Sequence, residues 1–130
     1  MLSIFRIAAG ILFITFGTMK VFGHPAGPPG MPPFDPMTQM GIGGLLETLG
    51  GTLIVLGLLT RPVAFILAGE MAVAYFQFHY PQSFFPTTNM GTPAIMYSLF
   101  YLYLVFAGAG VWSVDEVIRR RRTEGYVSQG

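Results

Sequence analysis

RIAAGILFITFGTMK (residues 6–20) and GGLLETLGGTLIVLGLLTR (residues 43–61) are the two stretches of sequence that decide the fold. In each stretch, charged and small residues recur at alternating intervals of four and three, which places them on one stripe of a helix. The first stripe contains Arg6, Gly10, Phe13, Gly17 and Lys20, and the second contains Gly43, Glu47, Gly50, Ile54, Gly57 and Arg61. A charge that faces hydrocarbon is costly, and glycine lets a partner helix come close. The pattern therefore predicts two membrane helices that pack together along a polar seam.

The composition indicates an integral membrane protein. The chain has 130 residues, of which 52% are hydrophobic and only 10% are charged, whereas ordinary soluble domains have about 25% charged residues. The mean hydropathy is +0.59. Because a membrane span needs about 20 mostly apolar residues, four spans and short loops nearly exhaust this length. We therefore predict a single all-α domain over residues 1–130, built as a four-transmembrane-helix, up-down antiparallel bundle.

Charge and cysteine content exclude several classes of function. The net charge is +1, and no basic aromatic surface indicates a nucleic-acid partner. The chain has no cysteine, which removes disulfides, thiolate nucleophiles and iron–sulfur ligation. Any redox role must therefore be carried by a bound cofactor, a quinone or a partner protein.

The positions of the cations predict the topology. We expect spans over about residues 2–21, 40–60, 62–80 and 94–112, followed by a basic tail over residues 113–130. Four spans place Arg6, Arg61 and the arginines at 119–122 on one side, with Lys20 near the other. The positive-inside rule then puts both termini in the cytoplasm of a bacterial-type inner membrane. The arginine run is typical of an anchor at the lipid headgroups.

Depth in the membrane predicts which ions meet. With a rise of about 1.5 Å per residue, Lys20 and Glu47 lie at a similar outer depth. Arg6 or Arg61 is expected to pair with Asp115 on the inner side. Glu70, in the middle of the third span, has no cation at its depth. The ions either fix the register of the helices or, in the case of Glu47 and Glu70, line a cavity that moves protons or binds a polar ligand.

The histidines and the aromatic residues suggest contacts beside the loops rather than a metal centre. His24 and His79 lie at the outer ends of spans, and no third ligand is spaced with either one, so no haem or metal site is expected. His79 is expected to form a hydrogen-bonding cap beside the outward loop. The aromatic residues of the fourth span fit packing, although an aromatic-lined slot there could hold a quinone ring. The predicted polar-seam or ligand residues are Arg6, Lys20, Glu47, Arg61, Glu70, His79 and Asp115, and none is assigned a catalytic role.

The ordered set of motifs resembles the DoxX family of small four-helix membrane proteins. The first span carries R-x3-G-x2-F-x3-G-x2-K from Arg6, and the second carries E-x2-G-G-x5-G-x2-T-R from Glu47. The remaining matches, which extend the resemblance to Asp115, are Glu70-Met71, His79-x-Pro81, Phe85-Pro86, Asn89-x-Gly91 and Trp112-Ser113-Val114-Asp115. One departure concerns the entry to the fourth span, where this chain has Thr92 and Pro93 and related sequences commonly have a glutamate.

The resemblance implies the fold and suggests a type of function. The family is named for a subunit associated with thiosulfate:quinone oxidoreductase, and other members are linked to membrane-associated oxidoreductase complexes. The resemblance thus implies a membrane accessory subunit that works with a membrane or periplasmic oxidoreductase subunit near the quinone pool. Two alternatives stay open: a small-molecule or proton-linked carrier, and a structural helper for other membrane proteins. Assembly as a homo-oligomer is compatible with the pattern.

Overall fold

A computed structural model describes residues 1–27 and 30–129. Pro28 and Pro29, which lie between the first two predicted spans, and Gly130 at the end of the predicted tail lie outside the described residues. All regular elements of the described chain are helices, which confirms the all-α prediction. They are α1 (Leu2–Phe22), α2 (Gln39–Leu56), α3 (Thr60–Ala74), a π-helix (Tyr75–His79), a 3-10 turn (Tyr80–Gln82), α4 (Thr92–Ala107) and α5 (Val114–Gln129).

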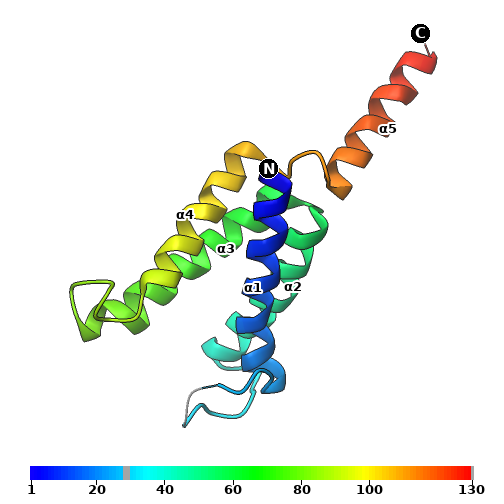
Figure 1. Ribbon diagram of the computed structural model, residues 1–130. Coiled ribbons are helices and arrows are strands. Elements are labelled where there is room, and N and C mark those ends of the chain that lie inside the picture. Colours follow the sequence, from blue (N-terminus) through cyan, green and yellow to red (C-terminus); the bar gives the residue numbers. More distant parts are fainter. Residues whose placement is uncertain (28–29, 130) are drawn as a thin grey trace.

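The helices form two antiparallel hairpins (Figure 1). Helix α1 lies along α2, and α3 lies along α4. The hairpins diverge from the end that carries the N-terminus, and α5 projects away from that same end (Figure 1). Phe13 of α1 joins the hairpins, since its ring centroid lies 5.1 Å from those of both Tyr97 and Tyr101 of α4.

The predicted glycine stripe brings α1 and α2 into close contact. A Cβ added at Gly17 would lie 2.5 Å from the backbone nitrogen of Thr48 and 2.9 Å from the carbonyl oxygen of Gly44. Real Cβ atoms do not approach backbone atoms so closely, so only glycine permits this contact. Besides Ser3, the buried residues of α1 are the first four members of the predicted stripe, Arg6, Gly10, Phe13 and Gly17.

The second stripe is buried from Glu47 to Gly57, whereas Gly43 at its start is half-buried. Helix α2 ends at Leu56, and Gly57 has the left-handed φ of 68° that terminates the helix. A new helix begins at Thr60, so the helical periodicity that places Glu47 and Ile54 on the buried face does not continue to Arg61. The Arg61 side chain is exposed, and its predicted position on the polar seam is wrong.

The fourth helix is shorter than the predicted span. Helix α4 ends at Ala107 rather than at Trp112, because Gly108 and Gly110 take positive φ values of 78° and 86° and turn the chain back over the bundle. The predicted basic tail is itself helical, as α5. Within the described chain, α1 and α2 are the helices long and apolar enough to cross a membrane, while α4 is apolar but shorter.

Candidate functional site

Lys20 and Glu47 form the ion pair that the sequence predicts. Lys20 Nζ donates a hydrogen bond to Glu47 Oε1 at 2.7 Å, across the contact between α1 and α2. Only 2% of the Glu47 residue is exposed, and its second oxygen, Oε2, has no hydrogen-bond partner among the described residues. The pair therefore leaves one buried acceptor atom free.

Glu70 reaches toward α2 from the facing helix α3. A Cβ added at Gly43 would lie 3.1 Å from Glu70 Oε1, so the carboxylate sits directly over this glycine. Within the described chain, Glu70 Oε2 is buried without a hydrogen-bond partner, and no cation lies within ion-pair distance of Glu70. The absence of a paired cation agrees with the prediction from depth.

A cavity of about 700 Å³ lies between these helices and is mostly walled by apolar side chains. We call it the glutamate cavity, lined by Lys20, Gln39, Met40, Gly43, Leu46, Glu47, Ile66, Gly69, Glu70, Val73, Ala74, Phe78, His79 and Gln82. A second cavity of about 150 Å³ shares Lys20, Glu47, Ala74 and His79 with it and adds aromatic walls. The larger volume falls in the range of about 300–1,000 Å³ that is usual for small-molecule sites.

His79 caps the loop before α4, as predicted. Its Nδ1 lies 3.0 Å from the carbonyl oxygen of Asn89. Sequence reasoning missed the role of Asn89, which is fully buried and organises this loop. Asn89 Nδ2 donates to the carbonyl of Ser83 at 2.9 Å, and its Oδ1 accepts from the backbone of Gly91 at 2.8 Å. The Asn-x-Gly spacing was the available signal, because asparagine side chains often bond the backbone two residues on.

At the other end of the bundle, Arg6 is fully buried among backbone carbonyls. Its Nη2 donates to Trp112 at 2.7 Å and to Val55 at 3.3 Å, and its Nη1 donates to Ala109. Arg6 therefore joins the end of α2 to the segment that follows α4. No carboxylate lies within ion-pair distance of Arg6 in the described part of the chain, so its predicted pairing with Asp115 is wrong.

Asp115 caps a helix instead of pairing with an arginine. Its two carboxylate oxygens accept hydrogen bonds from the backbone nitrogens of Leu59 at 2.8 Å and Thr60 at 2.9 Å. These are the first groups of α3, where free N–H groups and the helix dipole favour a negative charge. The sequence missed this role because Asp115 is remote in sequence from the helix that it caps.

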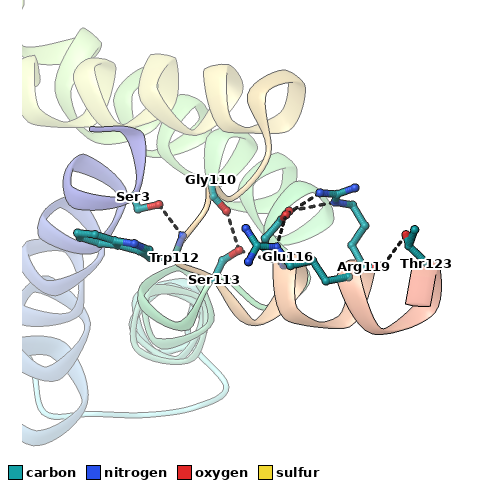
Figure 2. A network of polar contacts seen from close by, with 8 residues as sticks. Ser3, Gly110, Trp112, Ser113, Glu116, Arg119 and Thr123 are labelled. Carbon is teal, nitrogen blue, oxygen red and sulfur yellow. Dashed lines mark hydrogen bonds and ion pairs between the residues drawn. The ribbon is translucent and has the colours of Figure 1, made fainter. Parts of the chain in front are cut away.

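A chain of polar contacts connects the N-terminus to α5 (Figure 2). Ser3 Oγ accepts a hydrogen bond from the Trp112 backbone at 3.1 Å. Ser113 Oγ donates to the Gly110 carbonyl at 2.9 Å and accepts from the Glu116 backbone at 3.1 Å. Glu116 forms ion pairs with Arg119 and Arg120. The hydrogen bond from Arg119 is the main cause that lowers the pKa of Glu116 to about 2.

The Lys20–Glu47 pair predicts an asymmetric double-mutant cycle. We expect Lys20→Met to lower the free energy of unfolding by about 3 kcal/mol, because it leaves the Glu47 carboxylate buried without a counter-ion. Glu47→Gln should cost less, because the partly exposed Lys20 amine can reach water. The double variant should lose less stability than the sum of the single variants. Additive losses, measured by denaturant unfolding in detergent micelles, would contradict the pairing.

The fold and the site define a small all-helical protein with apolar helices of spanning length and buried charges. This chain belongs to the DoxX family, whose family model matches residues 1–80. A relative from Haemophilus influenzae, named an uncharacterized protein, is 42% identical over 119 residues, covering 88% of this chain and 87% of the relative. A second relative, the inner membrane protein YqjF of Escherichia coli, is 32% identical over 123 residues, covering 89% and 90%. No solved structure matches the chain.

Proposed function

We propose that the protein is an accessory subunit of an oxidoreductase system in the bacterial inner membrane, where it binds a ligand of the quinone class in the glutamate cavity. Its membership of the DoxX family and its similarity to a relative named as an inner membrane protein support this location. The accessory role comes from the association of the family with quinone-linked oxidoreductases. Residues of the chain would bind and orient the ligand, and a partner would supply the electrons.

The proposed topology has four spans with both termini in the cytoplasm. Helices α1 and α2 have the length and apolarity of spans. Helix α3 continues without a break through the π-helix and the 3-10 turn to Gln82, which extends its reach. Helix α4 has 16 residues, or about 24 Å, against about 30 Å of hydrocarbon. Local thinning of the bilayer accommodates such a short helix at modest cost.

The observation that carries the proposed ligand class is the contrast between the walls of the cavity and its two glutamates. Most of the cavity wall is apolar, while Glu47 and Glu70 each keep one buried carboxylate oxygen that has no partner in the part of the chain that the structure describes. An unpartnered buried acceptor is costly, and a bound hydroxyl group would satisfy it. A molecule with an apolar ring and hydroxyl or carbonyl substituents fits both parts of this site. Quinones in their reduced form have that chemistry.

The same glutamates favour a proton-linked carrier as the second candidate function. Glu47 and Glu70 line the same cavity as Lys20, which pairs with Glu47, and such a group of ionisable residues in a membrane segment is typical of a proton path. A carrier would transport its substrate into vesicles that contain this chain alone. An accessory subunit would be inert alone and would need its redox partner, and a structural helper would bind neither substrate nor quinone.

Co-purification from native membranes tests the accessory role. We expect the chain, extracted in a mild detergent, to bring with it an oxidoreductase whose absorption spectrum reveals a redox cofactor. A short-chain quinone, offered in its oxidised and reduced forms, should bind to the purified chain in lipid nanodiscs. Isolation of the chain without a redox partner, together with substrate uptake by vesicles that contain it alone, would favour the carrier.

Gly69→Leu predicts a loss of ligand binding without a loss of stability. Gly69 lines the glutamate cavity, and a Cβ added there meets no atom within 4 Å. The position is open around the Cβ and exposed, so we expect leucine to be tolerated there and to narrow the cavity, while it raises the helix propensity of α3 by up to about 1 kcal/mol. We expect binding of the short-chain quinol to weaken at least about tenfold, a loss of about 1.4 kcal/mol. Unchanged binding in nanodiscs would place the ligand outside this cavity.

A further inference from the structure

A second large cavity lies at the opposite end of the molecule from the glutamate cavity. Its volume is about 630 Å³. We call it the arginine cavity, lined by Leu59, Thr60, Arg61, Pro62, Ala107, Gly108, Ala109, Gly110, Val111, Ser113, Asp115, Glu116 and Arg119. It is thus formed by the start of α3, the segment after α4 and the first turns of α5. The proposed function assigns no role to this cavity.

The acidic residues of the arginine cavity are already occupied. Asp115 accepts from the backbone at the start of α3, and Glu116 accepts from Arg119 and Arg120. Arg61, in contrast, has no ion pair or side-chain hydrogen bond among the residues that the structure describes. Its guanidinium lies beside Gly108, because a Cβ added there would be 3.4 Å from both Nε and Nη2 of Arg61. The cavity therefore presents in its wall a guanidinium that forms no ion pair with any described residue.

The thirteen residues of the wall also contain a buried hydroxyl. Thr60 is 1% exposed, and its Oγ1 has no hydrogen-bond partner among the described residues. A hydroxyl and a guanidinium at adjacent positions are both hydrogen-bond donors. Donors of this kind recognise a phosphate group, and arginine matches phosphate with two parallel hydrogen bonds. The backbone N–H groups of Leu59 and Thr60 at the start of α3 are not available to the phosphate, because they already donate to Asp115.

The surroundings of the cavity indicate where the phosphate comes from. Trp112, which is 67% exposed, stands between two residues of the cavity wall, and the neighbouring Val111 is 64% exposed. An exposed tryptophan beside arginines is typical of the membrane–water interface, where lipid phosphates lie. Basic pockets on the cytoplasmic side of membrane proteins bind the headgroups of anionic lipids. We infer that the arginine cavity binds the phosphate group of an anionic membrane phospholipid, with Arg61 as its main contact.

The single tryptophan of the chain allows a direct test of this inference, which relies on the proposed membrane location but not on the quinone ligand. The full-length chain is reconstituted in phosphatidylcholine bilayers, and brominated lipids, which quench tryptophan, are titrated in. We expect brominated phosphatidylglycerol to quench Trp112 at a much lower mole fraction than brominated phosphatidylcholine. Arg61→Gln should weaken the relative association of phosphatidylglycerol about tenfold or more, as for the loss of a charge-assisted hydrogen bond.

Matched variants separate a built site from general attraction of charge. Arg122→Gln removes the same charge from an exposed position of α5 that is outside the cavity wall, and it should change the association less than twofold. Arg61→Lys keeps the positive charge and should keep most of the preference for phosphatidylglycerol over phosphatidylcholine. Each variant is checked for unchanged helix content by circular dichroism. Equal losses in Arg61→Gln and Arg122→Gln would overturn the inference, because they would indicate attraction by net charge alone.

Three further outcomes identify which assignment fails. Quenching by both lipids without a preference for phosphatidylglycerol would overturn the lipid site and leave the membrane location standing. Quenching by neither lipid would overturn the membrane location and the lipid site together. Complete displacement of the lipid by millimolar inorganic phosphate would show a site for free phosphate and would overturn the lipid assignment.

Discussion

Replacing Arg6 by Met is expected to lower the free energy of unfolding by roughly 3 kcal/mol or more. The guanidinium is fully buried and donates to the carbonyls of Val55, Ala109 and Trp112. Each hydrogen bond to a charged group contributes about 1.5–3 kcal/mol, and its loss leaves a buried acceptor without a partner. Methionine keeps much of the volume of arginine but offers no donor. The loss should appear in denaturant unfolding of the purified chain in detergent micelles.

The control for Arg6→Met is Arg122→Met on α5. Arg122 is exposed, so its replacement should change the free energy of unfolding by less than about 0.5 kcal/mol. A second readout is the position of the segment after α4, which the Arg6 hydrogen bonds hold to the end of α2. Exchange of the amide hydrogens of Trp112, which donates to Ser3 Oγ, and Asp115, which donates to the Gly57 carbonyl, should therefore speed up in Arg6→Met. Equal stability of the two variants would show that the carbonyl contacts of Arg6 contribute nothing.

The glycine seam could be predicted from the sequence because its signal is local and repeated. The intervals of four and three place Arg6, Gly10, Phe13 and Gly17 on one face whatever the rest of the chain does. The structure buries all four residues. The Lys20–Glu47 pair followed from the same stripes, since antiparallel neighbours of known length bring these positions to the same depth.

The errors occur where long-range contacts override the periodicity. Arg61 continues the second stripe in sequence, but Gly57 breaks the helix before the stripe reaches it. Asp115 was expected to pair with an arginine. Its carboxylate instead accepts hydrogen bonds from two backbone N–H groups at the start of α3. The two terminal nitrogens of Arg6 likewise donate to carbonyls rather than to an acid, while its Nε is buried without a partner among the described residues. The intervals of four and three carry no information about which backbone groups the turns between helices bring together.

Some residues of the glutamate cavity could be predicted from the sequence, but the shapes of the glutamate cavity and the arginine cavity could not. Glu47, Glu70 and Lys20 stood out because ionisable residues are rare in apolar segments, and the structure places them around one cavity. The empty space beside Gly69 depends on the angle at which the two hairpins diverge. The spacing of residues along α2 and α3 does not determine that angle. The arginine cavity depends on the path of the chain between α4 and α5, where two glycines with positive φ set the turn.

Glu70→Gln is expected to weaken binding of a short-chain quinol at least about tenfold while the fold stays intact. Glu70 Oε2 has no hydrogen-bond partner among the described residues, so the substitution breaks no internal bond at this atom. The amide has nearly the same shape, and the free energy of unfolding should change by less than about 1 kcal/mol. For the ligand the change is large, because one of the two carboxylate oxygens becomes an N–H₂ group that cannot accept from a hydroxyl. The amide oxygen that remains carries no negative charge to strengthen its hydrogen bond.

Binding in nanodiscs and unfolding in detergent are both measured for Glu70→Gln, with Glu124→Gln on the exposed face of α5 as the matched control. The control makes the same chemical change far from the glutamate cavity and should bind the quinol like the wild type. If the partner oxidoreductase co-purifies, Glu70→Gln should also abolish the quinone-dependent rate of the complex without dissociating it. Normal quinol binding combined with lower stability would instead assign Glu70 to the contact with α2 at Gly43. The ligand would then have to rely on Glu47, which lines the same cavity and also has a buried carboxylate oxygen without a partner among the described residues.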